Sequence, residues 1–199
     1  MAKDQSKQRL LEAGRSLLAS GTVLGVNAVA AKAGLNKVLI YRYFQDWDGY
    51  LEVISEGLNL WRAIRLELVE GLASDRWTDP ASASAWVLNA YQQSLRNEPG
   101  ILTIMANEQA RSSPLLVRLD QERETEGLLI LHALREKWPL LPWNRVLGLS
   151  ALLSAGLSHL ILRSRQTNFF NGLDLAKDET WNGLIQDIEE LVRTALSPG

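Results

Sequence analysis

The side chains that could carry out chemistry in this chain gather in one short run near its amino end. Residues 36–44, NKVLIYRYF, combine Lys37 and Arg42 with two tyrosines and several apolar residues. By propensity alone such a run suggests a buried β-strand. Lysine, arginine and tyrosine can also hold phosphate groups, and a lysine near a helix start can reach a guanine edge. The run is therefore either core or a surface that contacts a nucleic acid.

Catalytic chemistry finds little support elsewhere. The chain has no cysteine and two histidines, with no glycine-rich phosphate loop and no His-Glu pattern at metal-ligand spacing. We therefore expect no enzyme activity, no metal site and no cofactor. The acidic run DQERETE, residues 120–126, is most simply interpreted as a solvated helix face.

Charge is distributed unevenly along the chain. Residues 1–44 carry seven Lys and Arg against two Asp and Glu, whereas the remaining residues have a net charge of −7, giving −2 overall. This asymmetry is typical of a basic module that meets a polyanion, attached to an acidic body that does not. The polar first ten residues lack the apolar stretch of a secretory signal, so we expect a cytoplasmic protein.

The apolar periodicity predicts an all-α fold of about nine helices and no sheet. One long helix is expected from an Asp46 cap to about Ser74, and Pro80, Pro99 and Pro114 are each expected to begin a helix. A final amphipathic helix is predicted over residues 178–196.

Residues 146–162 form a run without formal charge at the lower edge of membrane-spanning length. A regular line of serines and His159 within the run favour a helix buried in protein. Such a helix near the carboxyl end would need a second subunit, with small residues allowing close approach. We therefore expect a homodimer and no membrane partner, with a membrane-attached helical protein as the alternative.

The run at residues 36–44 is better explained as the second helix of a helix-turn-helix. Asn36 is a good N-cap, and Ile40 and Phe44 then share one inward face. A small residue at the helix crossing, a glycine in the turn and an apolar plug are the steric demands of this motif. Ala30, Gly34 and Ile40 meet these demands.

With these features, residues 7–51 resemble the DNA-binding domain of TetR (tetracycline-repressor) family regulators, through Gly21, Ala33-Gly34 and YRYF at 41–44. The resemblance implies a three-helix DNA-binding domain over residues 1–47 and a larger helical ligand-binding and dimerisation domain over 48–199. It also implies a dimeric regulator, expected to be a ligand-responsive repressor, with a palindromic double-stranded DNA operator. The candidate DNA-binding residues are Asn27, Asn36, Lys37, Val38, Leu39, Tyr41, Arg42 and Tyr43.

The sequence departs from the family pattern at three places. Gly25 stands where a Thr or Ser cap is usual, Trp47 stands where a phosphate-contacting Lys is common, and Tyr43 replaces the common His. An all-helical small-molecule-binding or adaptor protein that has lost DNA binding therefore remains an alternative.

The small-molecule effector is of unknown identity. Aromatic and polar side chains on the central helices are the candidates for binding it. Arg65 and Arg123 lie on otherwise apolar stripes, where a cation must be paired, serve an anionic ligand or extend to the surface. The candidate ligand-binding residues are Trp61, Arg65, Trp86, Tyr91, Met105, Arg123, His132 and His159.

Overall fold

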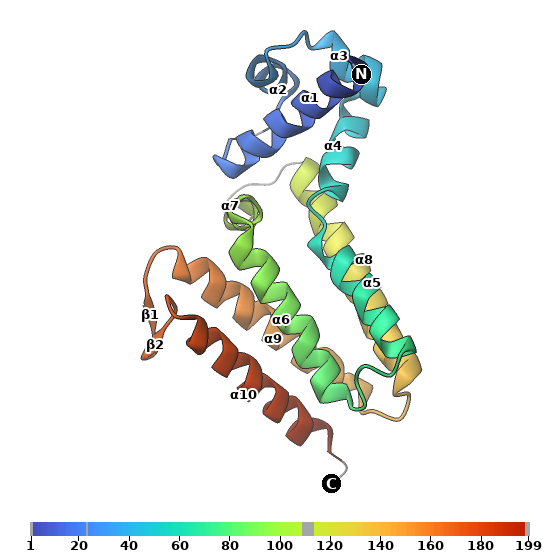
Figure 1. Cartoon of the computed structure of the whole chain (residues 1–199), viewed down its shortest axis with the longest axis vertical. Coiled ribbons are helices and arrows are strands. Elements are labelled where there is room, and N and C mark those ends of the chain that lie inside the picture. Colours follow the sequence, from blue (N-terminus) through green and yellow to red (C-terminus); the bar gives the residue numbers. More distant parts are fainter. Residues whose placement is uncertain (1, 23, 109–113, 198–199) are drawn as a thin grey trace. The chain divides into compact units, whose positions relative to one another are not determined.

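The computed structural model describes residues 2–22, 24–108 and 114–197, which form ten helices and one short hairpin (Figure 1). The helices are α1 (Ala2–Ala19), α2 (Val26–Ala33), α3 (Val38–Phe44), α4 (Trp47–Glu56), α5 (Leu60–Ala73), α6 (Pro80–Asn97), α7 (Pro99–Glu108), α8 (Pro114–Lys137), α9 (Trp143–Ser164) and α10 (Asp178–Leu196). The predicted all-α class is confirmed, and three prolines begin helices as expected.

The chain forms two compact units. The first contains Met1–Asn59 and Glu98–Arg123, and the second contains Leu60–Asn97 and Glu124–Gly199. This division follows packing within the chain, so the functional boundary expected at residue 47 stays a prediction.

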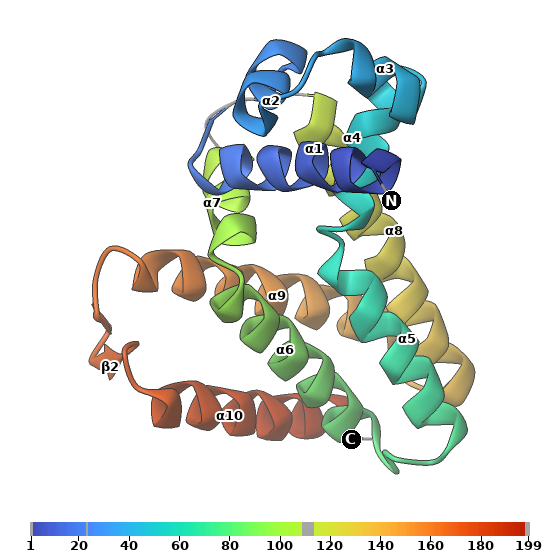
Figure 2. The same ribbon diagram turned by 45° about the horizontal axis from the view of Figure 1, so that its top comes forward.

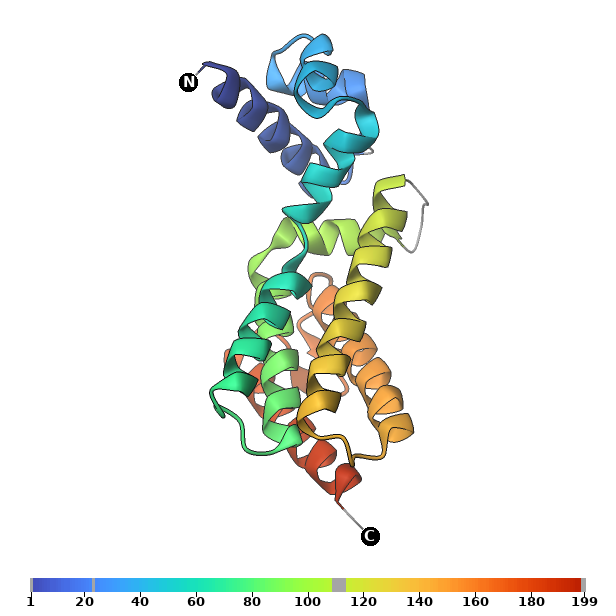
Figure 3. The same ribbon diagram turned by 90° about the vertical axis from the view of Figure 1, so that its right-hand side faces the viewer.

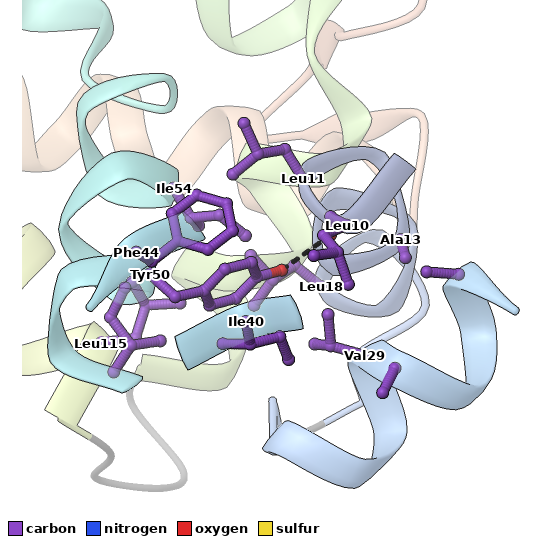
Figure 4. Close-up of a cluster of buried hydrophobic side chains, with 13 residues drawn as sticks. Leu10, Leu11, Ala13, Leu18, Val29, Ile40, Phe44, Tyr50, Ile54 and Leu115 are labelled. Carbon is purple, nitrogen blue, oxygen red and sulfur yellow. Dashed lines mark hydrogen bonds between the residues drawn. The ribbon is translucent and has the colours of Figure 1, made fainter. Parts of the chain in front are cut away.

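The core of the first unit is built around the amino-terminal helices (Figure 4). Leu10 of α1, Ile40 of α3 and Ile54 of α4 are fully buried in it. Tyr50 is also fully buried, and its hydroxyl donates a hydrogen bond to the Leu10 carbonyl at 2.9 Å. Apolar residues from five helices, α1 to α4 and α8, thus share one core, and this core fixes which side of α3 faces inward.

One predicted element is wrong: the long helix expected over residues 46–74 is two helices, α4 and α5. Helical bonding ends at residues 57–59, where Leu58 N–H donates to the Ser55 carbonyl at 2.9 Å. Glycine at position 57 favours such a break because it has low helix propensity. The interruption is close to one helical turn, so the apolar spacing continues across it and conceals it from a periodicity argument.

The second unit contains a layer in which α6 crosses α9 and α10, which run in opposite directions (Figure 2). Trp181 of α10 is 1% exposed, and its indole N–H donates to the Leu175 carbonyl at 2.9 Å. The helix α5 lies beside α6 (Figure 3). A stacked Trp61–Tyr91 pair, with ring centroids 4.3 Å apart, joins these two helices.

A small antiparallel hairpin of β1 (Phe169–Phe170) and β2 (Leu173–Asp174) connects α9 to α10. Its two turn residues, Asn171 and Gly172, have φ of 47° and 86°. Two positive φ values in a two-residue Asn-Gly loop favour a hairpin turn. The expectation of no sheet was therefore wrong at this segment, although the hairpin does not change the all-α class.

Candidate nucleic-acid interface

The turn between α2 and α3 is short and closed by backbone hydrogen bonds. Gly34 ends α2 in the left-handed conformation, with φ of 63°. Its N–H donates to Ala31 at 3.1 Å, and Leu35 N–H donates to Ala30 at 3.0 Å. This 6→1 bond from Leu35 is typical of a Schellman cap, in which glycine adopts positive φ without steric cost. The turn therefore holds α3 in a defined orientation relative to α2.

The start of α3 is capped by a side chain. The Asn36 side-chain oxygen accepts a hydrogen bond from Val38 N–H at 2.9 Å. This bond satisfies one of the backbone donors that a helix start leaves unpaired. Lys37 is thereby held in the first turn, where its side chain is exposed.

The two sides of α3 differ sharply in burial. Ile40 and Phe44 are 0% and 5% exposed, as their spacing predicts, whereas Val38 and Tyr41 are 61% and 47% exposed. We call Lys37, Val38, Tyr41 and Arg42, all exposed, the outer face of α3. This face combines two cations, a phenol and one apolar group.

The remaining DNA-binding candidates are less uniform. Asn27 of α2 and Asn36 are exposed, while Leu39 and Tyr43 are partly buried and pack against the core of the first unit. Leu39 and Tyr43 therefore present only part of their side chains outward.

The arrangement on the outer face suits contact with a nucleic acid. Lys37, Tyr41 and Arg42 can donate to phosphate oxygens, and Lys37 can also reach a guanine edge. Val38 can pack on a thymine methyl group. Only a part of this set could read sequence, since phosphate contacts fix register without distinguishing bases.

The junction between α3 and α4 is rigid. Asp46 caps α4 by accepting Gly49 N–H at 2.7 Å. A Cβ atom at Gly49 would lie 2.1 Å from the Phe44 carbonyl oxygen, so only glycine allows this close approach. Trp47 stacks on Tyr50 with ring centroids 4.9 Å apart, and Phe44 meets Tyr50 edge-on at 5.0 Å. Trp47 is thus engaged in packing at the position where the family pattern commonly has a lysine.

The ligand-binding candidates divide between the two units. Met105 and Arg123 belong to the first unit, and the other six candidates belong to the second. Trp61 and Tyr91 form the stacked pair, and the Tyr91 hydroxyl lies 2.7 Å from the Ser158 hydroxyl. Trp86 packs instead on Trp77, with ring centroids 4.8 Å apart.

The charged candidates have partners within the chain. Arg65 pairs with Glu126 at 2.5 Å, and Arg123 lies 3.7 Å from Asp120. His132 is an exposed neighbour of Glu136, while His159 lies on the exposed side of α9 against Phe170. Among these candidates, the structure thus brings Trp61 and Tyr91 into direct contact.

The interpretation of residues 120–126 as a solvated face was wrong for two of its glutamates. Glu126 is 9% exposed and binds Arg65, and Glu122 accepts a hydrogen bond from the buried Ser55 hydroxyl at 2.7 Å. Glu122 and Glu126 are one turn apart on α8 and therefore share a face of that helix. The position of Arg65 on an apolar stripe left open a paired cation, an anionic ligand or a side chain that extends to the surface, and it did not identify Glu126 as the partner.

Comparison with known proteins shows the fold. No protein-family model and no curated protein matches the chain. A solved structure of a TetR family transcription regulator from Marinobacter aquaeolei VT8 is similar, with a TM-score of 0.62 and 14% sequence identity. The alignment covers 94% of this chain and 95% of that chain. The fold suggested by residues 7–51 is therefore confirmed over nearly the whole length.

Proposed function

We propose that this protein is a DNA-binding transcriptional regulator, a ligand-responsive repressor that binds a palindromic operator as a homodimer. The observation that carries the proposal is the outer face of α3, which presents Lys37, Val38, Tyr41 and Arg42 while Ile40 and Phe44 hold the helix in the core. The fold shared with a TetR family transcription regulator supports it. The functional division is residues 1–47 for DNA and 48–199 for ligand binding and dimerisation.

Dimerisation is supported by the surface of α9. Residues along one side of this helix are exposed at helical spacing: Leu147, Gly148, Ala151, Leu152, Ala155, Gly156 and His159. Leu152 is 74% exposed, and Leu191 of α10 is 49% exposed. A second copy covering this face would bury apolar surface and form a self-complementary twofold interface.

The same helix is also the one candidate membrane span among the described residues. It is long and apolar enough, and 17% of its most apolar window is buried. A single such helix is weak support for a membrane protein, and cover by a second subunit accounts for the same exposure. We therefore propose a cytoplasmic protein, and recovery without detergent after cell fractionation tests this.

Regulation follows from linkage. In the dimer, α3 of each subunit enters a major groove of the operator. The two α3 helices are then about 34 to 36 Å apart, or at a distance adapted to the operator. An effector bound among the central helices causes release of DNA if it favours a state in which the two α3 helices are a different distance apart. Bound DNA then weakens effector binding by the same coupling free energy. Trp61 and Tyr91, which stack on each other, are the two effector candidates that lie together.

Selection of bound sequences from random duplex DNA by the purified protein tests the function. We expect one palindromic sequence to be enriched. Lys37→Ala and Tyr41→Ala should each weaken binding to it by about tenfold, the value of one good polar contact. Lys177→Ala is the control, because Lys177 is an exposed cation of the second unit. This variant should bind the selected DNA with unchanged affinity.

The second candidate function is a helical ligand-binding or adaptor protein without DNA binding, favoured by the packing of Trp47 on Tyr50. A DNA-binding protein loses affinity steeply as salt concentration rises, because it displaces condensed counterions. Absence of any enriched sequence and of any salt-dependent DNA affinity would overturn the DNA-binding proposal and leave this candidate.

A further inference from the structure

Three helices of the first unit are attached to α1 within two of its turns. The Leu10 carbonyl accepts the Tyr50 hydroxyl of α4 (Figure 4), and the Lys7 ammonium lies 5.4 Å from the centre of the Phe44 ring of α3. Arg9 contacts α2, since its Nη2 atom donates to the Ala33 carbonyl at 2.7 Å. The helix α1 therefore contacts both helices of the helix-turn-helix, α2 and α3, and also α4.

The Arg9 bond completes the cap of α2. Backbone N–H groups of the turn satisfy the carbonyls of Ala30 and Ala31. The Ala33 carbonyl belongs to the final residue of the helix, and the Arg9 guanidinium donates to it from a different helix. A cation at this end is also favoured by the negative partial charge of a helix C-terminus.

The turn leaves space for this guanidinium. A Cβ atom at Gly34 would lie 3.3 Å from Arg9 Nη2, tighter than ordinary packing. Glycine at this position therefore serves both the positive φ of the turn and the approach of Arg9. Residues 34–36 lead directly to Lys37, so the cap fixes the point at which the outer face of α3 begins.

We propose that Arg9 is a positioning residue for DNA recognition, holding the turn before α3 without itself binding DNA. The proposal rests on the proposed DNA-binding function. A helix C-terminus disfavours phosphate because both carry negative charge, so the guanidinium there is aimed at protein and not at the DNA backbone. A phosphate-binding arginine and a positioning arginine differ in one measurable respect, the salt dependence of binding.

The experiment uses the full chain and the duplex enriched by selection. In Arg9→Met we expect affinity to fall about tenfold, as for loss of one charge-assisted hydrogen bond, with the slope of log affinity against log salt unchanged. Arg42→Met, which removes an exposed cation of α3, should reduce the magnitude of that slope by about 1. Arg9→Lys should recover part of the affinity because an ammonium group can donate to the same carbonyl.

Hydrogen exchange gives a second readout that requires no DNA. The amides of Gly34 and Leu35 should exchange faster in Arg9→Met, because their bonds close the turn that Arg9 supports. If Arg9→Met loses helical circular dichroism, the same two measurements on Arg9→Lys decide the question.

Two results would overturn the proposal. The first is that Arg9→Met reduces the slope of log DNA affinity against log salt as Arg42→Met does. The second is that Arg9→Met binds DNA with normal affinity and leaves amide exchange at Gly34 and Leu35 unchanged. Failure of the unmodified protein to bind any duplex would instead overturn the proposed function.

Discussion

Tyr50 is the residue on which the packing of the first unit converges. Its ring meets Phe44 edge-on and stacks on Trp47, and its hydroxyl reaches Leu10 of α1. A Cβ atom at Gly14 would lie 2.1 Å from that hydroxyl, so the close approach of α1 and α4 depends on glycine there. Tyr50 of α4 thus contacts α3 through its ring and α1 through its hydroxyl.

Burial of Tyr50 has a consequence at alkaline pH. Desolvation raises the pKa of the Tyr50 phenol far above its ordinary value of 10.0, although Arg15 opposes this shift. Because the folded pKa is higher than the unfolded one, the contribution to stability is complete below about pH 10 and is lost as pH rises further. In urea unfolding, Tyr50→Phe should cost about 1 kcal/mol at pH 7 through the lost hydrogen bond. The same substitution should reduce the loss of stability between pH 10 and pH 11.

Tyr41→Phe provides the matched control at pH 7, since Tyr41 is 47% exposed. It should change the free energy of unfolding by less than about 0.5 kcal/mol. An equal alkaline loss of stability in Tyr50→Phe and the unmodified protein would contradict the role assigned to Tyr50.

Residues with local roles were predictable from the sequence. The caps at Asn36 and Asp46, the turn at Gly34 and the inward Ile40 and Phe44 follow from neighbours within a few positions. Contacts between residues that are distant in the sequence could not be predicted from it. Glu126 is 61 residues from Arg65, and Ser158 is 67 residues from Tyr91, so no local pattern joins either pair.

At the scale of elements, the interruption between α4 and α5 is the feature that periodicity could not detect. The two helices bury their apolar residues in different cores: Leu51 and Ile54 in the first unit, Ile64 and Leu68 in the second. The end of α4 is held by Ser55, which is fully buried, and by Asn59, whose side chain donates to Glu122 at 3.4 Å. Glu122 of α8 therefore receives donors from both sides of residue 57.

Removal of the Ser55 hydroxyl tests this attachment. Ser55→Ala should lower the free energy of unfolding by about 2 kcal/mol, because it leaves the partly buried Glu122 carboxylate without its shortest hydrogen bond. Ser74→Ala is the control, because Ser74 directly follows α5 and its exposed hydroxyl donates to the Glu70 carbonyl of that helix at 3.0 Å. Equal stabilities for the two variants in urea unfolding would argue against the attachment.

At the scale of the whole molecule, the proposed dimer accounts for apolar surface that one chain leaves uncovered. Leu152→Glu would bury an unpaired charge in the interface and should raise the dimer dissociation constant by at least about a hundredfold. Leu140→Glu is the control, since Leu140 is 98% exposed and precedes α9. Sedimentation velocity across a concentration series measures both. A Leu152→Glu variant that dimerises as tightly as Leu140→Glu would place the interface elsewhere.

More of the fold than of the dimer interface could be predicted from the sequence. Helix periodicity and caps depend on residues close in sequence, whereas an interface depends on a surface that forms only when the chain folds. The apolar α9 indicated such a surface, but the packing of α6 and α10 against this helix determines which of its sides is exposed. The hairpin at residues 169–174 was missed because a strand of two residues leaves almost no alternation to detect.

Photocrosslinking from the outer face of α3 tests the central claim most directly. The protein carrying p-benzoyl-phenylalanine in place of Tyr41 should crosslink to the selected duplex at two symmetric positions, one from each subunit. The same photoreactive residue in place of Leu140 should give no crosslink. A duplex that is bound tightly, crosslinks from position 140 and fails to crosslink from position 41 would contradict the assignment of α3 as the helix that contacts DNA.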